Sequence, residues 1–370
     1  MPSLPQYRPH QAVDETPDPL SPAPFHPDID AAAFAAALSA SNATGNPLSL
    51  YVHLPFCRQH CHHCVRDKIA AREAQQADPY LQRLEREMVL VASHLDRARK
   101  ITQLVWGGGT PTFLTLGQMS RLIDMLDAHF TLSGDRNRDY AIEIDPREAN
   151  VFTLRHLQTL GFNRLSLGVA DLDLRVQQAI NRIQPRVLTE NLVDEARRLG
   201  FQTLSLELVY GLPQQTQDSL SETLEQVIAL APDRVSLTPY MHWPERYAAQ
   251  RSIDVALLPD AHASGTMADA AREQLVMAGY VHLGRLHFAL PDDSLAIALH
   301  QGTLRHGVLG YSGQAPTDHV GFGVSAISQV DGLYAQNATL LPDYVMAIDS
   351  DRLATIQGLV AVAGRDVAQP

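Results

Sequence analysis

Cysteine is scarce in this chain: it has three in 370 residues, and all three lie between positions 57 and 64. An odd number of closely spaced thiols argues against a disulfide framework and suits a reducing compartment. Cys57, Cys61 and Cys64 have the spacing C-x3-C-x2-C and follow an extended apolar segment at 48–54. Scattered structural thiols are not expected to fall so close together, so the cluster indicates a ligand site.

The chain also has few positively charged residues and no long hydrophobic run. The chain has 29 Lys and Arg against 41 Asp and Glu, a net charge of −12, which argues against nucleic acid as the main partner. No apolar run approaches the roughly 20 residues of a membrane span. The N-terminus has neither the apolar core of a secretory signal nor an Arg-rich amphipathic pattern. We therefore expect a cytoplasmic protein without a membrane span.

A chain of this length with 45% hydrophobic residues can bury one sizeable domain with appendages. Residues 1–28 carry eight prolines, and we expect a largely disordered, Pro-rich arm over 1–46. Strands alternating with amphipathic helices then predict a parallel sheet whose crossovers are helices. Six such units in about 190 residues favour a partial (β/α)6 TIM-like barrel over a complete eight-fold one. The predicted strands are 48–54, 101–106, 140–145, 163–169, 203–209 and 234–239.

The first predicted helix has the clearest pattern. Asp78 is its expected N-cap with Pro79 at the first helical position. Apolar side chains then recur at steps of three and four, forming one buried stripe of Leu81, Leu84, Met88, Val91 and Leu95. Two later helices are expected to end at Gly161 and Gly200, since glycine adopts the left-handed conformation of a helix C-terminus.

Unusual residues follow one strand after another. In parallel barrels the reactive groups gather at the C-terminal ends of the strands. The cysteine loop follows the first strand, a Gly107-Gly-Gly-Thr-Pro-Thr112 segment the second, and Glu143 and Asp145 end the third. Gly168-Val-Ala-Asp171 follows the fourth strand, and Glu207 lies in the fifth. The sequence therefore predicts one site built from five strand ends.

Three thiolates on one short loop can hold three irons of a cubic iron–sulfur cluster, leaving the fourth iron open to a small molecule. Zinc is the rival ligand, because four histidines crowd the same region and a Cys3His site is chemically reasonable. Inert buried thiols are the third interpretation, and all three stay open from the residues alone. The histidines are His53, His60, His62 and His63, and His62 is expected to be a surface group.

The cysteine spacing behind a strand resembles that of radical S-adenosylmethionine (SAM) enzymes. Further segments between about 47 and 345 resemble the oxygen-independent coproporphyrinogen III oxidases, also called coproporphyrinogen dehydrogenases. They include Tyr51-Val-His-Leu-Pro-Phe-Cys57, Trp106-Gly-Gly-Gly-Thr-Pro-Thr112, Ile142-Glu-Ile-Asp-Pro-Arg-Glu148, Gly161-Phe-Asn-Arg-Leu-Ser-Leu-Gly168 and Tyr210-Gly-Leu-Pro213.

The resemblance implies a [4Fe–4S] cluster and SAM as cofactors, and oxidative decarboxylation of coproporphyrinogen III to protoporphyrinogen IX in anaerobic haem biosynthesis. Because such a cluster must be reduced before SAM is cut, we also expect a low-potential electron donor, and we expect the chain to be a monomer. By the same comparison, 47–240 is the radical SAM barrel, 241–345 an α/β extension covering the barrel mouth, and 346–370 a short tail. The family's C-terminal helical domain would begin near Pro370 and is expected to be absent.

Site residues follow from the resemblance by position. Cys57, Cys61 and Cys64 would ligate the cluster, and Tyr51 and Glu143 are the expected catalytic residues. Of the positions expected to bind SAM, Gly108, Gly109 and Thr110 would receive the methionine end, Glu143 its amino group and Arg182 its carboxylate. Ala170 and Glu207 are the positions expected at the ribose. The other expected SAM-binding positions are Tyr51, His63, Met241 and Ile327, of which Ile327 would line the pocket.

Several positions depart from the family pattern. Ala170 replaces a glutamine, Glu207 an aspartate and His63 a phenylalanine, while Arg66 stands where a further cysteine is usual. The loss of two ribose hydrogen bonds weakens SAM binding by roughly 1–3 kcal/mol. Val308-Leu309 also replaces a Phe-Gln pair that the family needs for activity.

These departures leave two further hypotheses: a radical SAM enzyme acting on another tetrapyrrole, or a non-catalytic haem-binding chaperone of the same fold. In the second hypothesis the candidate haem ligands are His242, His282, His287 and His306.

Overall fold

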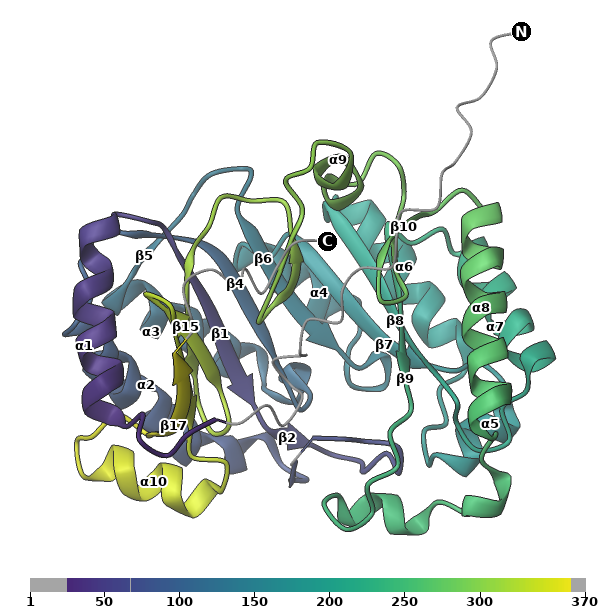
Figure 1. The fold of residues 1–370 in the computed structure, drawn as a ribbon, viewed down its shortest axis with the longest axis horizontal. Helices are drawn as coiled ribbons and strands as arrows, with labels where there is room; N and C mark the ends of the chain where they lie inside the picture. The colour runs from purple at the N-terminus through teal and green to yellow at the C-terminus, as the bar shows by residue number, and fades with distance from the viewer. Residues whose placement is uncertain (1–24, 67, 361–370) are drawn as a thin grey trace, which may run out of the picture.

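The computed structural model describes residues 25–66 and 68–360, and a thirteen-stranded mixed sheet runs through this part of the chain (Figure 1). The six predicted strands are all present, with boundaries within two residues of those expected. They are β1 (Leu48–Leu54), β4 (Lys100–Gly108), β6 (Asp139–Ile144), β7 (Arg164–Ala170), β8 (Thr203–Tyr210) and β9 (Arg234–Pro239). They lie side by side in this order, each parallel to the next, as the alternation with helices predicts.

Residues beyond 240 extend the sheet at both edges. At one edge β14 (Asp318–Phe322) pairs parallel with β1, and β15 (Ile327–Val330), β16 (Leu333–Asn337) and β17 (Thr355–Val360) follow antiparallel. At the other edge β11 (His287–Ala289) pairs antiparallel with β9, and β10 (Val281–Gly284) with β11. The order from β10 to β17 has two free ends, so the sheet is a partial barrel, as predicted.

Helices cover the outer face of the sheet. In Figure 1 α1, α2, α3 and α10 lie toward one end of the molecule, and α5, α7 and α8 toward the other. Their bounds are α1 (Ala31–Ser41), α2 (Asp78–Ala92), α3 (Leu116–His129), α4 (Val151–Thr159), α5 (Leu174–Ala179), α6 (Arg186–Leu199), α7 (Gln217–Ala229), α8 (Ala261–Met277), α9 (Ser294–His300) and α10 (Leu341–Asp349). None of these described helices has the length and apolar character needed to cross a membrane.

Four residues of the predicted stripe are confirmed, since Leu81, Leu84, Met88 and Val91 are fully buried in α2. The fifth, Leu95, is wrong as a helical position, because α2 ends at Ala92 and Leu95 lies half-buried in the bend that follows. The predicted N-cap is wrong, because Ala77 holds that position and Asp78 is the first helical residue. A short 3₁₀ turn with its own capping box leads directly into the helix, and Asp78 instead accepts a hydrogen bond of 3.0 Å from the Gln118 side chain. The helix ends at Gly161 and Gly200 are confirmed, with φ of 94° and 76°.

The predicted disordered arm over 1–46 is wrong for its second half. Residues 31–41 form α1, an alanine-rich helix whose Phe34 and Leu38 are buried in the main core, and residues 1–24 lie outside the described part. The predicted tail 346–370 likewise contains structure. The end of α10 belongs to the fold because Ile348 is buried in the main core, and β17 belongs to it because it pairs with β16 from Thr355 to Val360. Residues 361–370 lie outside the described part.

Smaller elements complete the described part. β5 (Thr131–Leu132) pairs with β4, while β2 (Phe56–Cys57) pairs with β3 (Ile69–Ala70) and β12 (Arg305–Gly307) with β13 (Gly310–Ser312). The division at 240 and the placement of 241–345 over the barrel mouth remain predictions.

Candidate functional site

The cysteine loop is fixed at its start to the C-terminal end of β4. Backbone N–H groups of Gly109 and Thr110 donate to the carbonyls of Leu54 and Phe56, each at 2.8 Å. The loop returns through the β2–β3 pair, which joins Cys57 to Ala70 in register. The segment that follows β4 therefore holds the first cysteine against the strand ends.

The far side of the loop is held by residues from other strand ends. The His62 N–H donates to the Ile180 carbonyl at 2.8 Å, and the Asn181 side chain donates to the His60 carbonyl at 2.9 Å. The Gln250 amide reaches the carbonyls of His63 and Cys64 at 3.5 and 3.4 Å. The loop thus spans the C-terminal ends of the parallel strands from β1 and β4 to the segments after β7 and β9.

The cysteine sulfurs lie among hydrogen-bond donors. Cys57 and Cys61 are buried and Cys64 is half-buried, and none forms a disulfide. The Cys57 Sγ lies 3.2 Å from the Thr110 hydroxyl, and the Cys61 Sγ accepts from Arg147 at 3.2 Å and Arg182 at 3.5 Å. Burial raises the pKa of Cys57, whereas at Cys61 the two guanidinium groups outweigh burial and lower the pKa.

This donor set fits an iron–sulfur cluster. Three free thiols on one loop supply the three ligands that a cubic cluster needs, and the two arginines beside Cys61 favour the thiolate form of that residue. Within the described residues no three His, Cys, Asp or Glu side chains gather around one ion position. A cubic cluster binds each thiolate at a different iron, so its cysteines need not converge on one point.

Asp145 joins the two arginines of this region. Its carboxylate accepts from Arg182 at 2.7 Å and from Arg147 at 2.7 Å and 3.0 Å. Burial opposes ionisation, yet these cations and hydrogen bonds hold the pKa of Asp145 well below its usual range. Arg182 is 7% exposed, so it does not simply face water. Its guanidinium also donates to the Gly168 carbonyl at 2.5 Å, and only the buried Nε finds no partner among the described residues.

Glycines at the end of β4 allow two side chains to approach the backbone closely. A Cβ at Gly107 would lie 2.7 Å from a Glu143 carboxylate oxygen, and a Cβ at Gly108 would lie 2.7 Å from the His53 ring. Gly108 also has φ of 104°, which disfavours a side chain. Glu143 Oε2 accepts from the Gly108 N–H at 3.2 Å and from Arg66 at 3.1 Å. Glu143 therefore lies against the glycine segment, as the strand-end argument predicts.

Aromatic and imidazole side chains line the adjoining part of the site. The Tyr51 hydroxyl lies 3.2 Å from His53 Nδ1 on the same strand. Burial raises the pKa of Tyr51 and lowers the pKa values of His53 and His63 to about 3, so all three are neutral at pH 7. His63 Nδ1 is buried without a hydrogen-bond partner in the described part of the chain. A contact between His63 and SAM stays a prediction.

The two positions predicted to lie at the ribose of SAM, Ala170 and Glu207, are on the neighbouring strands β7 and β8. Glu207 accepts a hydrogen bond of 2.5 Å from the Ser166 hydroxyl, and burial together with Glu143 raises its pKa. Ala170 is buried at the end of β7, beyond an irregularity in the β7–β8 register, and has φ of 64°. Its methyl group packs with Val176 and Leu212 in a small apolar cluster, so it offers no polar contact.

The remaining predicted positions lie nearer the edges of the site. Met241 is 41% exposed, and its carbonyl accepts from Gln250 at 2.9 Å. Ile327 begins β15, is buried, and lies against Gly321, which pairs with Tyr51 across β14 and β1. Arg147 was not predicted to be a partner of Cys61, although it lies in the 142–148 motif, and Arg66 was predicted only to depart from the family pattern.

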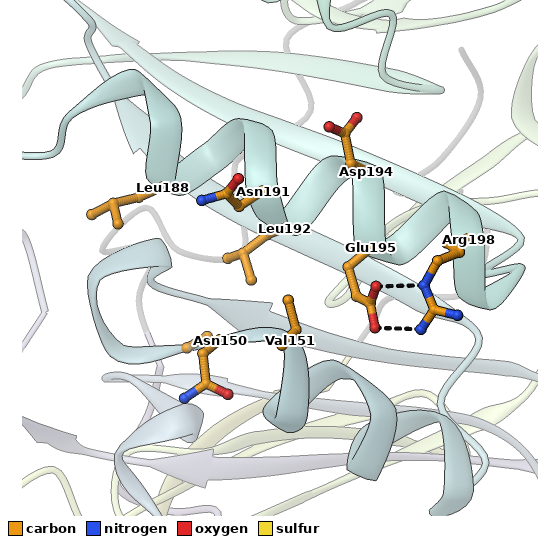
Figure 2. A pocket seen from close by; sticks show the side chains of 9 residues that line it. Asn150, Val151, Leu188, Asn191, Leu192, Asp194, Glu195 and Arg198 are labelled. Atoms are coloured by element: carbon orange, nitrogen blue, oxygen red, sulfur yellow. Dashed lines mark hydrogen bonds and ion pairs between the residues drawn. The ribbon is translucent and has the colours of Figure 1, made fainter.

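A shallow groove between the start of α4 and α6 is separate from these residues (Figure 2). Leu188, Leu192 and Val151 line it, and Glu195 forms a two-point ion pair with Arg198 at 2.6 and 2.7 Å. None of its lining residues is a predicted site position.

Comparisons with known proteins agree with this geometry. Residues 51–227 match the radical SAM superfamily, whose cofactors are a [4Fe–4S] cluster and SAM. An oxygen-independent coproporphyrinogen III oxidase of Pseudomonas aeruginosa is 47% identical over 323 residues, 87% of this chain and 70% of the relative. The Escherichia coli enzyme of the same name is 43% identical over 313 residues, 85% of this chain and 68% of the relative.

A solved structure agrees as well. The Escherichia coli coproporphyrinogen III oxidase (HemN), described as a radical SAM enzyme, superposes with a TM-score of 0.88 at 40% identity, covering 93% of this chain and 78% of that one. Sequence, cysteine loop and fold thus lead to one assignment: the chain belongs to the oxygen-independent coproporphyrinogen III oxidases of the radical SAM superfamily.

Proposed function

We infer that this chain is a radical SAM enzyme that oxidatively decarboxylates coproporphyrinogen III to protoporphyrinogen IX without oxygen. The observation that carries the inference is the cysteine loop held across the strand ends beside Glu143, in a chain 47% identical to an enzyme of that name. The sequence departures at Ala170 and Glu207 leave the three cysteines and the glycine segment in place.

Cys57, Cys61 and Cys64 would hold the cluster, with Arg147 and Arg182 donating to the Cys61 sulfur. When bound, the cluster and SAM supply the radical that takes hydrogen from the substrate's propionate side chains. Glu143 and the Gly108 carbonyl would provide acceptors for the amino group of SAM, and the Arg182 Nε–H, which has no partner among the described residues, would be a donor for its carboxylate. Tyr51 stays protonated beside them because burial raises its pKa.

The overall reaction sets the partners that the chain requires. Each propionate loses a hydrogen atom, CO2 and one electron to become a vinyl group, so an electron acceptor is needed as well as a low-potential donor for the cluster. We propose that the chain works as a monomer in the cytoplasm, a reducing compartment that suits its three free cysteines.

The test is release of 5′-deoxyadenosine by anaerobically reconstituted, reduced protein given SAM, with and without coproporphyrinogen III. We expect release that rises with this substrate, together with CO2. Release indifferent to coproporphyrinogen III would point to another tetrapyrrole. A protein that holds four irons and SAM but releases none would contradict both enzymatic hypotheses and leave the haem-binding one.

A further inference from the structure

Arg66 lies inside the proposed SAM site. Its Nη1 donates to Glu143 Oε2 at 3.1 Å and to the Gly108 carbonyl at 3.2 Å. These two acceptors come from neighbouring strands, β6 and β4, and one N–H group bridges them. They are also the two acceptors proposed above for the amino group of SAM.

A guanidinium and an ammonium ion need the same kind of binding position. Each is a cation with N–H donors only, and each needs a carboxylate and further oxygen acceptors within hydrogen-bond distance. One pair of acceptors cannot serve both cations at full strength. Binding of SAM in the proposed orientation therefore requires Arg66 to leave Glu143.

The Arg66 contact is suited to displacement. Its side chain is 45% exposed and that of Glu143 is 28% exposed, so the pair is partly in water and contributes little to folding. The ion pairs of Asp145 with Arg147 and Arg182 differ, because those side chains are only 8–10% exposed. A partly hydrated arginine on a long side chain can move outward without leaving an unpaired charge in the core.

Position 66 also links this contact to the cysteine loop. The Arg66 N–H lies 3.4 Å from the Cys64 Sγ, so its backbone is tied to the third cysteine while its side chain reaches Glu143. Burial and the nearby Glu143 raise the pKa of the second carboxylate of the site, Glu207, while Arg66 opposes this shift. Removal of the guanidinium leaves the two carboxylates available to another cation.

We propose that Arg66 is an internal competitor for the ammonium-binding position of SAM, so that it lowers SAM affinity and sets the SAM concentration at which the enzyme is loaded. The proposal rests on the proposed function, since it assumes that SAM binds through Glu143. It predicts that removing the guanidinium tightens SAM binding.

The experiment measures SAM dissociation constants by isothermal titration calorimetry on anaerobically reconstituted full-length protein. Arg66→Ala is expected to bind SAM about three- to tenfold more tightly than the unaltered protein. Arg66→Gln keeps most of the side chain without its charge and should show a gain of the same sign. Iron content and circular dichroism establish that each variant is folded and loaded.

Two controls isolate competition for the ammonium position. Arg58→Ala removes a cation from the same loop, but Arg58 pairs with Glu148 rather than Glu143, so SAM affinity should not change. A SAM analogue lacking the α-amino group can bind while Arg66 stays on Glu143, so its affinity should change by less than about twofold in Arg66→Ala.

The outcomes separate this proposal from the proposed function. Unchanged or weaker SAM binding in both Arg66 variants, with binding retained by the unaltered protein, overturns the competitor proposal and leaves the function intact. An equal gain for the analogue also overturns it, because the effect is then not specific to the amino group. Failure of every folded, iron-loaded protein to bind SAM overturns the proposed function and the competitor proposal together.

Discussion

Ala170 holds a left-handed backbone conformation at the end of β7, with φ of 64°, beside the proposed site. For a residue with a Cβ this conformation costs about 1–2 kcal/mol relative to glycine. The surrounding register keeps it there, because β7 and β8 shift relative to one another between Gly168 and Ala170. Backbone strain of this size is retained where neighbouring structure fixes the conformation.

Ala170→Gly is expected to be nearly neutral for folding. The substitution relieves about 1 kcal/mol or more of backbone strain, but it removes a buried methyl group that contributes about 0.8 kcal/mol. Ala196→Gly is the matched control, since Ala196 is equally buried but lies inside α6. It should lose about 2 kcal/mol from helix propensity and burial combined. Urea unfolding of the reduced apoproteins measures both, and equal losses would show that Ala170 is unstrained.

At the scale of secondary-structure elements, Glu87 connects α2 to three others. Its buried carboxylate accepts from the Gly323 N–H after β14 at 2.7 Å, from Asn337 in β16 at 2.6 Å and from Tyr344 in α10 at 2.8 Å. Burial raises the pKa of Glu87 to about 7, and the three donors only partly offset it. The protonated form is therefore favoured by folding.

This carboxyl group predicts a pH dependence of stability. Because its folded pKa exceeds the unfolded value, its contribution is fully present below about pH 4.5 and is lost as pH rises through about 7. The unfolding temperature of the apoprotein should thus decrease between pH 5 and pH 8 by more than that of Glu87→Gln, whose amide does not titrate. The difference corresponds to on the order of 3 kcal/mol at most. Parallel pH profiles for the two proteins would contradict this assignment.

Alternation of apolar segments was enough to predict β1 and β9 with their observed bounds, and glycines marked the ends of α4 and α6. Other elements could not be found this way. Strand β14 is short, contains His319 and Gly321, and lies between β1 and β15, which it pairs with on either side. Such tertiary pairing is not visible in its local sequence. The cap at Asp78 failed because a preceding 3₁₀ turn already satisfies the helix start.

In the candidate site, too, some residues could be predicted from the sequence pattern and others could not. The order of the strands predicted that Glu143 and Glu207 lie near one another at one end of the sheet, because topology alone brings the ends of parallel strands together. The contacts of Arg66 and Arg147 depend on how far a flexible side chain reaches between segments about 80 residues apart, to Glu143 and Cys61. Local sequence patterns carry no such information.

At the scale of the whole molecule, β1, the strand that precedes the cysteine loop, is paired with β14, which comes from the later part of the chain. All five residues of β14 pair with β1, from Leu48 with Asp318 to Val52 with Phe322. Arg99, which follows α2, forms a buried ion pair with Asp318. Loss of one partner from a buried pair destabilises by about 3–5 kcal/mol, and an uncovered β1 would be an apolar sheet edge.

A fragment comprising residues 1–240, the arm and predicted barrel, should therefore not fold alone. It retains the three cysteines and β1 to β9, but it lacks β14 and the partner of Arg99. We expect aggregation or rapid proteolysis and no stable iron binding, whereas co-expression with residues 241–370 should restore a soluble complex that binds iron. Solubility, limited proteolysis and iron content of the two preparations test this. A monomeric, protease-resistant fragment that binds iron would show instead that the barrel is an independent unit and that the β1–β14 pairing adds little to its stability.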